Sequence, residues 1–340
     1  MAMFRKPAKQ LKESLLKLWE LIPGWLRNKL SAGGRIILDF WRENLKVPVI
    51  AIIFGFLIGA LVILAIGKNP LLAYMAIYKS VFSNMRNFSE TIAYVTPLIF
   101  TGLAVAFAFR CGLFNIGAEG QVIVGMFATG YIGFTWPHLP PVILLPLAIL
   151  GGTLAGALWS GLPGLLKARL GVHEVINTIM MNHIAFYLVN WLVSEPFKVP
   201  NYQATAPVPE SIQLTKLSDL FSFEPASGHT GIFFALAAAV ICYLILWRTT
   251  LGFEIRATGF NAQASEYAGV SISRSLFMAM LISGAFAGLG GALQTLGVRY
   301  RVWEMATFPE FGFNGIAVAL IGKNHPAGVV LGAFLFGALM

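Results

Sequence analysis

The sequence has few charged residues and very few cysteines. Only 11% of its 340 residues are charged, whereas a soluble domain carries about 25%. The two cysteines, Cys111 and Cys242, lie at or within apolar runs, so we expect both to be buried packing residues. Two such cysteines form neither a disulfide framework nor a metal-ligand pattern. These absences argue against an ordinary soluble domain and against a disulfide-stabilised secreted one.

Motifs for catalysis are missing as well. No GxxxxGK[ST] phosphate loop, HExxH pair or Ser-His-Asp signature occurs. His173, Glu174 and His183 do not have the i, i+4 spacing of a zinc-binding helix. We therefore expect a chain that is not an enzyme and that holds no metal or cofactor of its own.

Apolar residues are what the sequence has in excess: 57% of the chain, with a mean hydropathy of +0.74. They form long uninterrupted runs of spanning length, not the short alternating segments of a membrane β-barrel. We predict an all-α, polytopic helical membrane protein with nine apolar segments and an interfacial helix at 71–82. The nine segments are 47–66, 91–109, 111–136, 142–166, 175–193, 231–247, 275–296, 311–321 and 327–340.

Positive charge is concentrated at the N-terminus. The net charge is +9, and residues 1–46 hold ten Lys and Arg against four acidic residues. Because basic residues beside the first span mark the cytoplasmic side, we interpret 1–46 as a cytoplasmic extension that includes an amphipathic helix over 11–21. Residues 47–340 form the predicted transmembrane domain. The charge is explained by the lipid bilayer, and no nucleic-acid partner is implied.

Loop charges predict the topology of the remainder. The loop 194–230 has four acidic residues and two Lys, which indicates an external loop, and the loop 248–274 has three Arg, which indicates a cytoplasmic one. Lys68, Lys79 and Arg86 on the first external loop run against this pattern. The last apolar run, 327–340, is about 21 Å of helix, too short for a core of about 30 Å, so we expect a truncated C-terminal span.

Two short stretches echo one another. Residues 112–117 read GLFNIG and residues 312–316 read GFNGI, and each opens a short, Gly-rich apolar segment. The charge pattern makes the two segments run in opposite directions across the membrane. An inverted repeat with interrupted helices is typical of transporters that bind their solute near the membrane midplane.

Asn115, Glu119 and Gln121 are polar residues within one apolar segment. An acid in a membrane span is costly and is a candidate functional residue. Two interpretations stay open: the three residues line a pathway, or Glu119 caps a broken helix by accepting backbone N–H bonds. The glycines at 112, 117 and 120 favour a broken helix in either case.

Two further patterns are ambiguous. At the head of the span 175–193, Asn177, Asn182 and their polar neighbours serve in capping and interhelical hydrogen bonds, or Asn177 lines a pore. In the span 275–296, Gly284 and Gly288 have the close-packing spacing of membrane helices. Helices with this spacing pack against other spans of the same chain or against a second copy of the chain.

A polar, helix-prone segment, residues 256–270, stands between two apolar spans. It suggests a docking site for a partner on the cytoplasmic loop. Four stretches together resemble the permease subunits of bacterial ABC importers for simple sugars, nucleosides and branched-chain amino acids. They are LFNIGAEGQ (113–121), GVHEVINTIMMNHIA (171–185), IRATGFNAQASEYAGVSISR (255–274) and GFNGIAVALIGKNHPAGVVLGA (312–333). The resemblance is strongest to nucleoside permeases that work with a lipoprotein binding protein. His173 departs from the family pattern, where we expect Asn.

The resemblance implies import through paired permeases, identical or related, in the bacterial inner membrane. Cytoplasmic ATPase subunits would bind ATP and Mg and dock on the loop 248–274, and an extracytoplasmic solute-binding protein would deliver the solute. Asn115, Glu119 and Asn314 would lie near the pathway, and we add Gln121 and Asn177. The residues implied for ATPase coupling are Arg256, Gly259, Asn261, Ala264, Tyr267, Ala268 and Gly269.

Two alternatives are carried forward. The first is an ABC permease for simple sugars or branched-chain amino acids in place of nucleosides. The second is an ion-coupled secondary transporter that uses Glu119 as its proton or sodium site.

Overall fold

Helices account for all the named elements of residues 46–340, which are the part of the chain described by a computed structural model. The amphipathic helix expected at 11–21 lies outside the described residues. Residues 53–340 pack together as one unit, and the contacts below lie within it. The helices are α3 (Lys46–Ala65), α4 (Pro70–Phe82), α5 (Met85–Phe109), α6 (Ala118–Thr135), α7 (Pro141–Leu170), α8 (Glu174–Ser194), α9 (Leu217–Phe221), α10 (Gly231–Arg248), α11 (Thr250–Phe260), α12 (Ala262–Tyr267), α13 (Ile272–Gln294), α14 (Phe311–Ile321) and α15 (Pro326–Leu339). A 3-10 turn, η2 (Glu210–Ile212), and a π-helical turn, η3 (Thr295–Arg299), complete the set.

These helices match the nine predicted apolar segments and the predicted helix at 71–82, so the all-α polytopic fold is confirmed. Within residues 46–340, four stretches are long and apolar enough to cross a membrane: α5, α7, α10, and α13 continued through η3. α5 begins six residues before the predicted span because the Asn84 side chain accepts a hydrogen bond from the backbone N–H of Asn87 at 2.8 Å. A polar cap therefore set the boundary that hydropathy alone missed.

Glycine contacts bring α7 and α13 close together within the chain. A Cβ on Gly156 would lie 2.6 Å from the carbonyl oxygen of Gly284 and 2.6 Å from the Cα of Gly288. Only hydrogen at these positions allows the two backbones to approach so closely. The spacing of Gly284 and Gly288 therefore joins spans within one chain, which settles the question left open by the sequence.

The two cysteines are buried and free, as predicted.

Two interrupted helices start side by side and run in opposite directions. The start of α6 touches the start of α14, where a Cβ on Gly312 would lie 2.2 Å from the backbone nitrogen of Glu119. α6 ends beside Val208, which contacts Gly133, and α14 ends near Asn324, which contacts Arg110 at the end of α5. This geometry agrees with the inverted arrangement predicted from GLFNIG and GFNGI.

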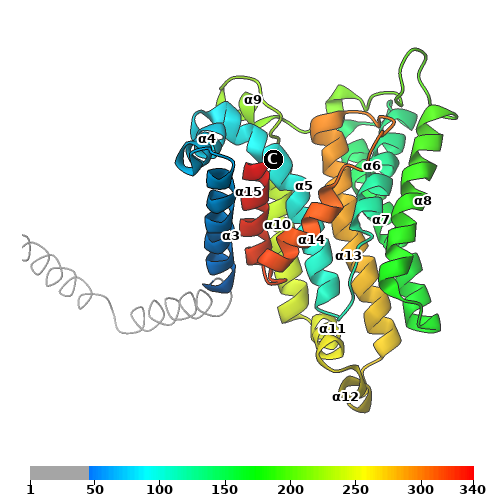
Figure 1. Cartoon of the computed structure of the whole chain (residues 1–340). Helices are drawn as coiled ribbons and strands as arrows, with labels where there is room; N and C mark the ends of the chain where they lie inside the picture. Colours follow the sequence, from blue (N-terminus) through cyan, green and yellow to red (C-terminus); the bar gives the residue numbers. More distant parts are fainter. Residues whose placement is uncertain (1–45) are drawn as a thin grey trace, which may run out of the picture. The chain divides into compact units, whose positions relative to one another are not determined.

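The bundle of residues 53–340 has two distinct ends. α11 and α12 form one end, which we call the α11–α12 end, and α9 lies at the opposite end, the α9 end (Figure 1). At the α9 end, residues 204–214 run beside 296–303 through backbone hydrogen bonds such as Thr205 N–H to Val302 O at 2.9 Å and Leu214 N–H to Leu296 O at 2.9 Å. The two ends thus differ in architecture, since the α11–α12 end is built of two short helices and the α9 end is built largely of a folded loop.

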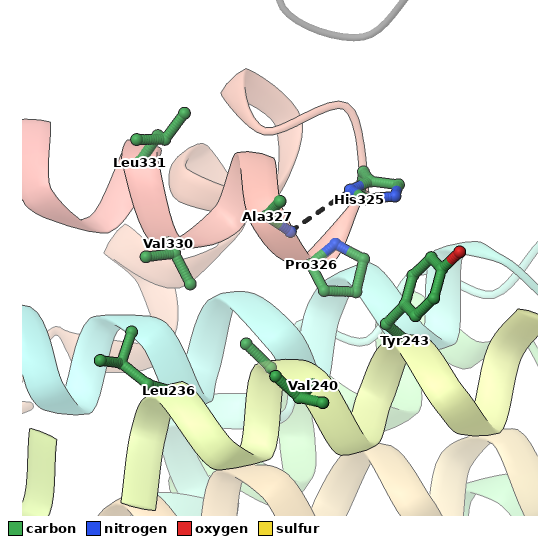
Figure 2. A pocket seen from close by; sticks show the side chains of 9 residues that line it. Leu236, Val240, Tyr243, His325, Pro326, Ala327, Val330 and Leu331 are labelled. Atoms are coloured by element: carbon green, nitrogen blue, oxygen red, sulfur yellow. Dashed lines mark hydrogen bonds between the residues drawn. The ribbon is translucent and has the colours of Figure 1, made fainter. Parts of the chain in front are cut away.

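An apolar groove of about 500 Å³ lies between α10 and α15. Figure 2 shows Leu236, Val240 and Tyr243 of α10 along one side and Val330 and Leu331 of α15 along the other. His325 closes the groove at one end, and its Nδ1 accepts a hydrogen bond from the backbone N–H of Ala327 at 3.3 Å, which caps α15 (Figure 2).

Candidate functional site

Glu119 caps α14. Its carboxylate accepts hydrogen bonds from the backbone N–H groups of Glu310 at 2.7 Å, Gly312 at 2.5 Å and Phe313 at 3.3 Å. These are donors at the start of a helix, which has no partner for them within its own backbone. A negative charge there also complements the positive end of the helix dipole. The capping interpretation of Glu119 is confirmed, and the helix that it caps is α14, whereas Glu119 itself belongs to α6.

Asn115 and Gln121 form a closed amide pair beside Glu119. Each side-chain NH2 group donates to the other side-chain oxygen at 3.1 Å, and Asn115 Nδ2 also donates to Ser283 Oγ at 2.8 Å. Ser283 Oγ in turn donates a hydrogen bond to the carbonyl oxygen of Ala104 at 2.6 Å. Asn115, Glu119 and Gln121 are at most 1% exposed. The structure thus brings these three predicted residues together as an internal joint, which we call the α6–α14 junction (residues 115–121 and 310–314).

Asn182 of α8 holds the other side of this junction. Its Oδ1 accepts a hydrogen bond from the backbone N–H of Gly120 at 2.8 Å, and its Nδ2 donates to the carbonyl of Ile116 at 3.0 Å. Asn182 therefore satisfies backbone groups where α6 begins, which confirms interhelical hydrogen bonding at the head of this span.

Asn177 and Asn314 lie apart from that network. Asn177 is in the first turn of α8 and its Nδ2 atom is buried with no hydrogen-bond partner among the described residues. Asn314 is half-buried near the start of α14. The pathway roles of the five predicted residues remain predictions.

The segment α11–α12 forms an exposed hook, residues 250–267. Asn261 separates the two helices and caps α12, since its Oδ1 accepts a hydrogen bond from the backbone N–H of Ala264 at 3.0 Å. Phe260 is 85% exposed and Tyr267 is 95% exposed, and a depression of about 450 Å³ is lined by Gln263, Glu266 and Tyr267. Gly269, with φ at +84°, turns the chain after the hook. The hook therefore carries two almost fully exposed aromatic side chains.

The base of the hook is packed tightly against the bundle. A Cβ on Gly259 would lie 2.2 Å from the carbonyl oxygen of Arg110, so α11 touches the turn that leads from α5 toward α6. Gly259 is exposed on one side, but it has no room for a side chain on the side that faces this turn. Ala264, Tyr267 and Ala268 are exposed and lie beyond it in the hook. The predicted coupling residues divide into a packed base and a free tip.

Trp247 connects this base to the turn between α14 and α15. The guanidinium carbon of Arg110 lies 5.1 Å from the centre of the Trp247 ring, that of Arg256 lies 5.7 Å from it, and the His325 ring lies 5.0 Å from it. Arg110 also donates to the carbonyls of Asn324 at 2.9 Å and Lys323 at 3.2 Å. Sequence reasoning missed Arg110 and Trp247; the only signal was a lone Arg directly after a long apolar run.

The α9 end carries charged and aromatic groups. A depression of about 590 Å³ is lined in part by Glu210, Arg299 and Arg301, and the guanidinium of Arg301 lies over the rings of Tyr202 and Trp303 at 5.3 Å and 5.4 Å. His229 is buried here, and burial lowers the pKa of its imidazole to about 4. The Nδ1 atom of His229 accepts a hydrogen bond from the backbone N–H of Gly231 at 3.1 Å, an arrangement that needs the neutral ring.

Comparison with known proteins identifies the family. Residues 87–340 match the family described as the permease component of the branched-chain amino acid transport system. The chain is 46% identical over 299 residues to the guanosine ABC transporter permease protein NupP of Bacillus subtilis. This alignment covers 87% of this chain and 85% of NupP. It is 38% identical over 307 residues to the nucleoside ABC transporter permease protein NupB of Lactococcus lactis (87% and 83%), and 32% identical over 306 residues to the glucose ABC transporter permease protein TsgB13 of Haloferax volcanii (86% and 78%).

No solved structure matches the chain. The match to the family covers most of the sequence, and the three relatives are ABC transporter permeases by name. Such permeases are transport subunits and not enzymes, and they work with a separate ATPase and a solute-binding protein. The chain therefore belongs to the ABC transporter permease family of the branched-chain amino acid type, and it is a multi-pass protein of the inner membrane.

Proposed function

We propose that this permease imports nucleosides into the cytoplasm. The observation that carries the import mechanism is the capped, exposed hook, whose packed base contacts both the α5–α6 turn and, through Trp247, the α14–α15 turn. A partner that moved the hook would act on the segment that leads into α6 and on the turn that follows α14. The solute class is supported by the likeness to permeases named for guanosine and for nucleosides.

The hook is the docking site for the cytoplasmic ATPase in this proposal. Arg256, Gly259 and Asn261 set the shape of the hook, and Ala264, Tyr267, Ala268 and Gly269 present it to the partner. From its charge, we propose a cytoplasmic location for the basic extension 1–46 as well. ATP and Mg bind to the ATPase, and ATP changes the permease only because it favours one of its two access states over the other.

The α9 end faces outward in this proposal. The loop 194–230 and the outward end of the segment 298–310 receive the solute-binding protein, which is a lipoprotein. The depression at this end is lined by Arg299, Arg301 and Glu210, charged groups that suit a partner surface of complementary charge. A second permease chain, identical or related, completes the pore.

Two observations favour this mechanism over ion-coupled transport. Both oxygens of Glu119 accept backbone N–H bonds, so the carboxylate is already bound as an anion by donors and offers a poor site for a sodium ion. The exposed tip of the hook has no use in a transporter that works alone. A glucose substrate, by analogy with TsgB13, is the second candidate for the solute.

The experiment is purification of the transporter from its native membrane in mild detergent, followed by identification of the associated proteins and uptake in proteoliposomes. We expect an ATPase and a lipoprotein to copurify, and guanosine uptake to require ATP and no ion gradient. A chain that purifies alone and takes up solute on an ion gradient contradicts the proposal. Uptake of glucose but not of guanosine contradicts only the solute.

A further inference from the structure

The two irregular segments that reach the α6–α14 junction differ in how they are covered. Residues 110–117 leave regular helix and are mostly buried, with Asn115 at 0% exposure. Residues 300–310 are also irregular, but Glu304, Thr307 and Glu310 are exposed. Non-helical backbone at membrane depth is tolerated only where protein buries it or where it lines a water-filled cavity. The first segment meets the first condition, and the exposed residues of the second segment fit the other.

His183 places the end of that second segment beside the middle of the predicted span 175–193. It lies near the centre of α8, whose ends are Glu174 and Ser194. Its ring is 5.3 Å from the ring of Phe308, at an interplanar angle of 79°. Phe308 therefore sits at the depth of the α8 midpoint, two residues before the exposed Glu310. An exposed histidine and an exposed carboxylate at that depth are costly in lipid.

Aromatic rings surround this point. Phe308 lies 4.7 Å from Phe186 and 5.7 Å from Phe313, measured between ring centres, and Phe313 is 38% exposed. The segment is fastened to α8 by Asn190, which donates to the carbonyl of Met305 at 2.9 Å and accepts from its N–H at 2.9 Å. The surface is thus built and held in place. We call it the aromatic face, and its members are His183, Phe186, Phe308, Glu310 and Phe313.

We propose that the aromatic face lines the translocation path and binds the base of a neutral nucleoside by stacking. Every nucleobase presents a π-face to such rings, and stacking on aromatic side chains tolerates differences between bases. His183 and Glu310 supply hydrogen-bonding groups at the edge of the rings. The exposed carboxylate of Glu310 repels phosphate, so the ligand is a nucleoside and not a nucleotide. The assignment of the ligand rests on the proposed function, whereas the exposure of the face to water does not.

Cysteine accessibility tests the location. His183→Cys and Glu310→Cys are introduced singly into the assembled transporter in proteoliposomes, where the native Cys111 and Cys242 are buried, and are treated with a membrane-impermeant quaternary-ammonium methanethiosulfonate. Leu158→Cys is the control: Leu158 is 70% exposed on α7, and its neighbour Trp159 donates to the carbonyl of Met181 on α8, so it has a similar depth. We expect modification at 183 and 310 and not at 158.

Protection of the cysteines by guanosine and substitution of Phe308 test the identity of the ligand. We expect guanosine to slow modification at 183 and 310 severalfold and guanosine 5′-monophosphate to have no effect. Phe308→Leu should raise the apparent KM for guanosine about tenfold, and Phe308→Tyr should restore it. Unmodified cysteines at both positions, as lipid or a second copy covering the face would produce, overturn the pathway assignment. Modification that guanosine does not slow overturns the stacking assignment. A complex that imports no nucleoside contradicts the proposed function instead, so the failures are distinguishable.

Discussion

The α6–α14 junction and the α11–α12 hook both use polar residues in an apolar chain, but they use them in opposite ways. At the junction, Asn115, Glu119 and Gln121 are almost fully buried, and each makes at least one side-chain hydrogen bond. At the hook, Asn261 caps a short helix, and Tyr267 is left 95% exposed. The comparison teaches that buried polar groups here join interrupted helices, whereas those of the hook cap a short helix on the surface for which we propose a partner.

The largest effect is expected at the junction. Glu119→Ala removes the acceptor for three backbone N–H groups, and each unpaired buried donor costs about 1–3 kcal/mol. We expect a loss of more than about 3 kcal/mol of stability, seen as a low yield of monodisperse protein in size-exclusion chromatography and as a lower unfolding temperature. Glu119→Gln keeps one acceptor oxygen and should fall between Ala and wild type. Glu195→Ala, an exposed acid at the end of α8, is the control; equal loss in both Ala variants would contradict the capping account.

At the tip of the hook, a substitution should affect binding and not folding. Tyr267→Ala removes the most exposed aromatic side chain of the hook, and such residues are frequent hot spots worth about 2 kcal/mol or more in an interface. We expect at least a tenfold loss of ATPase copurification with an unchanged unfolding temperature. Tyr78→Ala on α4, where Tyr78 is 65% exposed, is the matched control. A lower unfolding temperature for Tyr267→Ala alone would show that the tip belongs to the folded core.

A substitution at the base of the hook tests the connection between the hook and the α6–α14 junction, because the base lies between these two regions. Trp247→Leu removes the ring that Arg110, Arg256 and His325 share. We expect the ATPase to remain bound, with uptake per ATP hydrolysed falling severalfold. Uptake and hydrolysis are measured together in proteoliposomes, and Trp136→Leu, a half-exposed tryptophan at the end of α6, serves as control. Unchanged coupling would mean that movement of the hook bypasses Trp247.

The smallest effect concerns pH at the α9 end. His229 has a folded-state pKa of about 4 because of burial, below the ordinary value of about 6.5. The unfolded state therefore binds more protons between these values, so the stability that the neutral ring contributes is present above about pH 6.5 and is lost as the pH falls toward 4. We expect the unfolding temperature to fall over this window, and to fall less in His229→Gln. An equal fall in both proteins would assign the pH dependence to other groups.

Hydropathy was sufficient to predict the apolar helices, because spans must satisfy their backbone internally, but it gave no sign of α9 or of the break between α11 and α12. It could not predict α5 from residue 85, since Asn84 fixes that start through a cap. The residues of the junction were predicted together from their spacing, but the identity of the helix that Glu119 caps depends on contacts between residues about 190 positions apart. His183 gave no distinct signal, since its significance comes from Phe308 lying beside it.

The most direct test of the account is site-specific photo-crosslinking in intact membranes. The substitution Tyr267→p-benzoylphenylalanine places a reactive ketone at the tip of the hook, and the same substitution at Tyr78 provides the control. The account predicts an adduct with the ATPase from position 267 and none from position 78. No ATPase adduct from position 267, in a membrane that shows ATP-driven uptake, would contradict it.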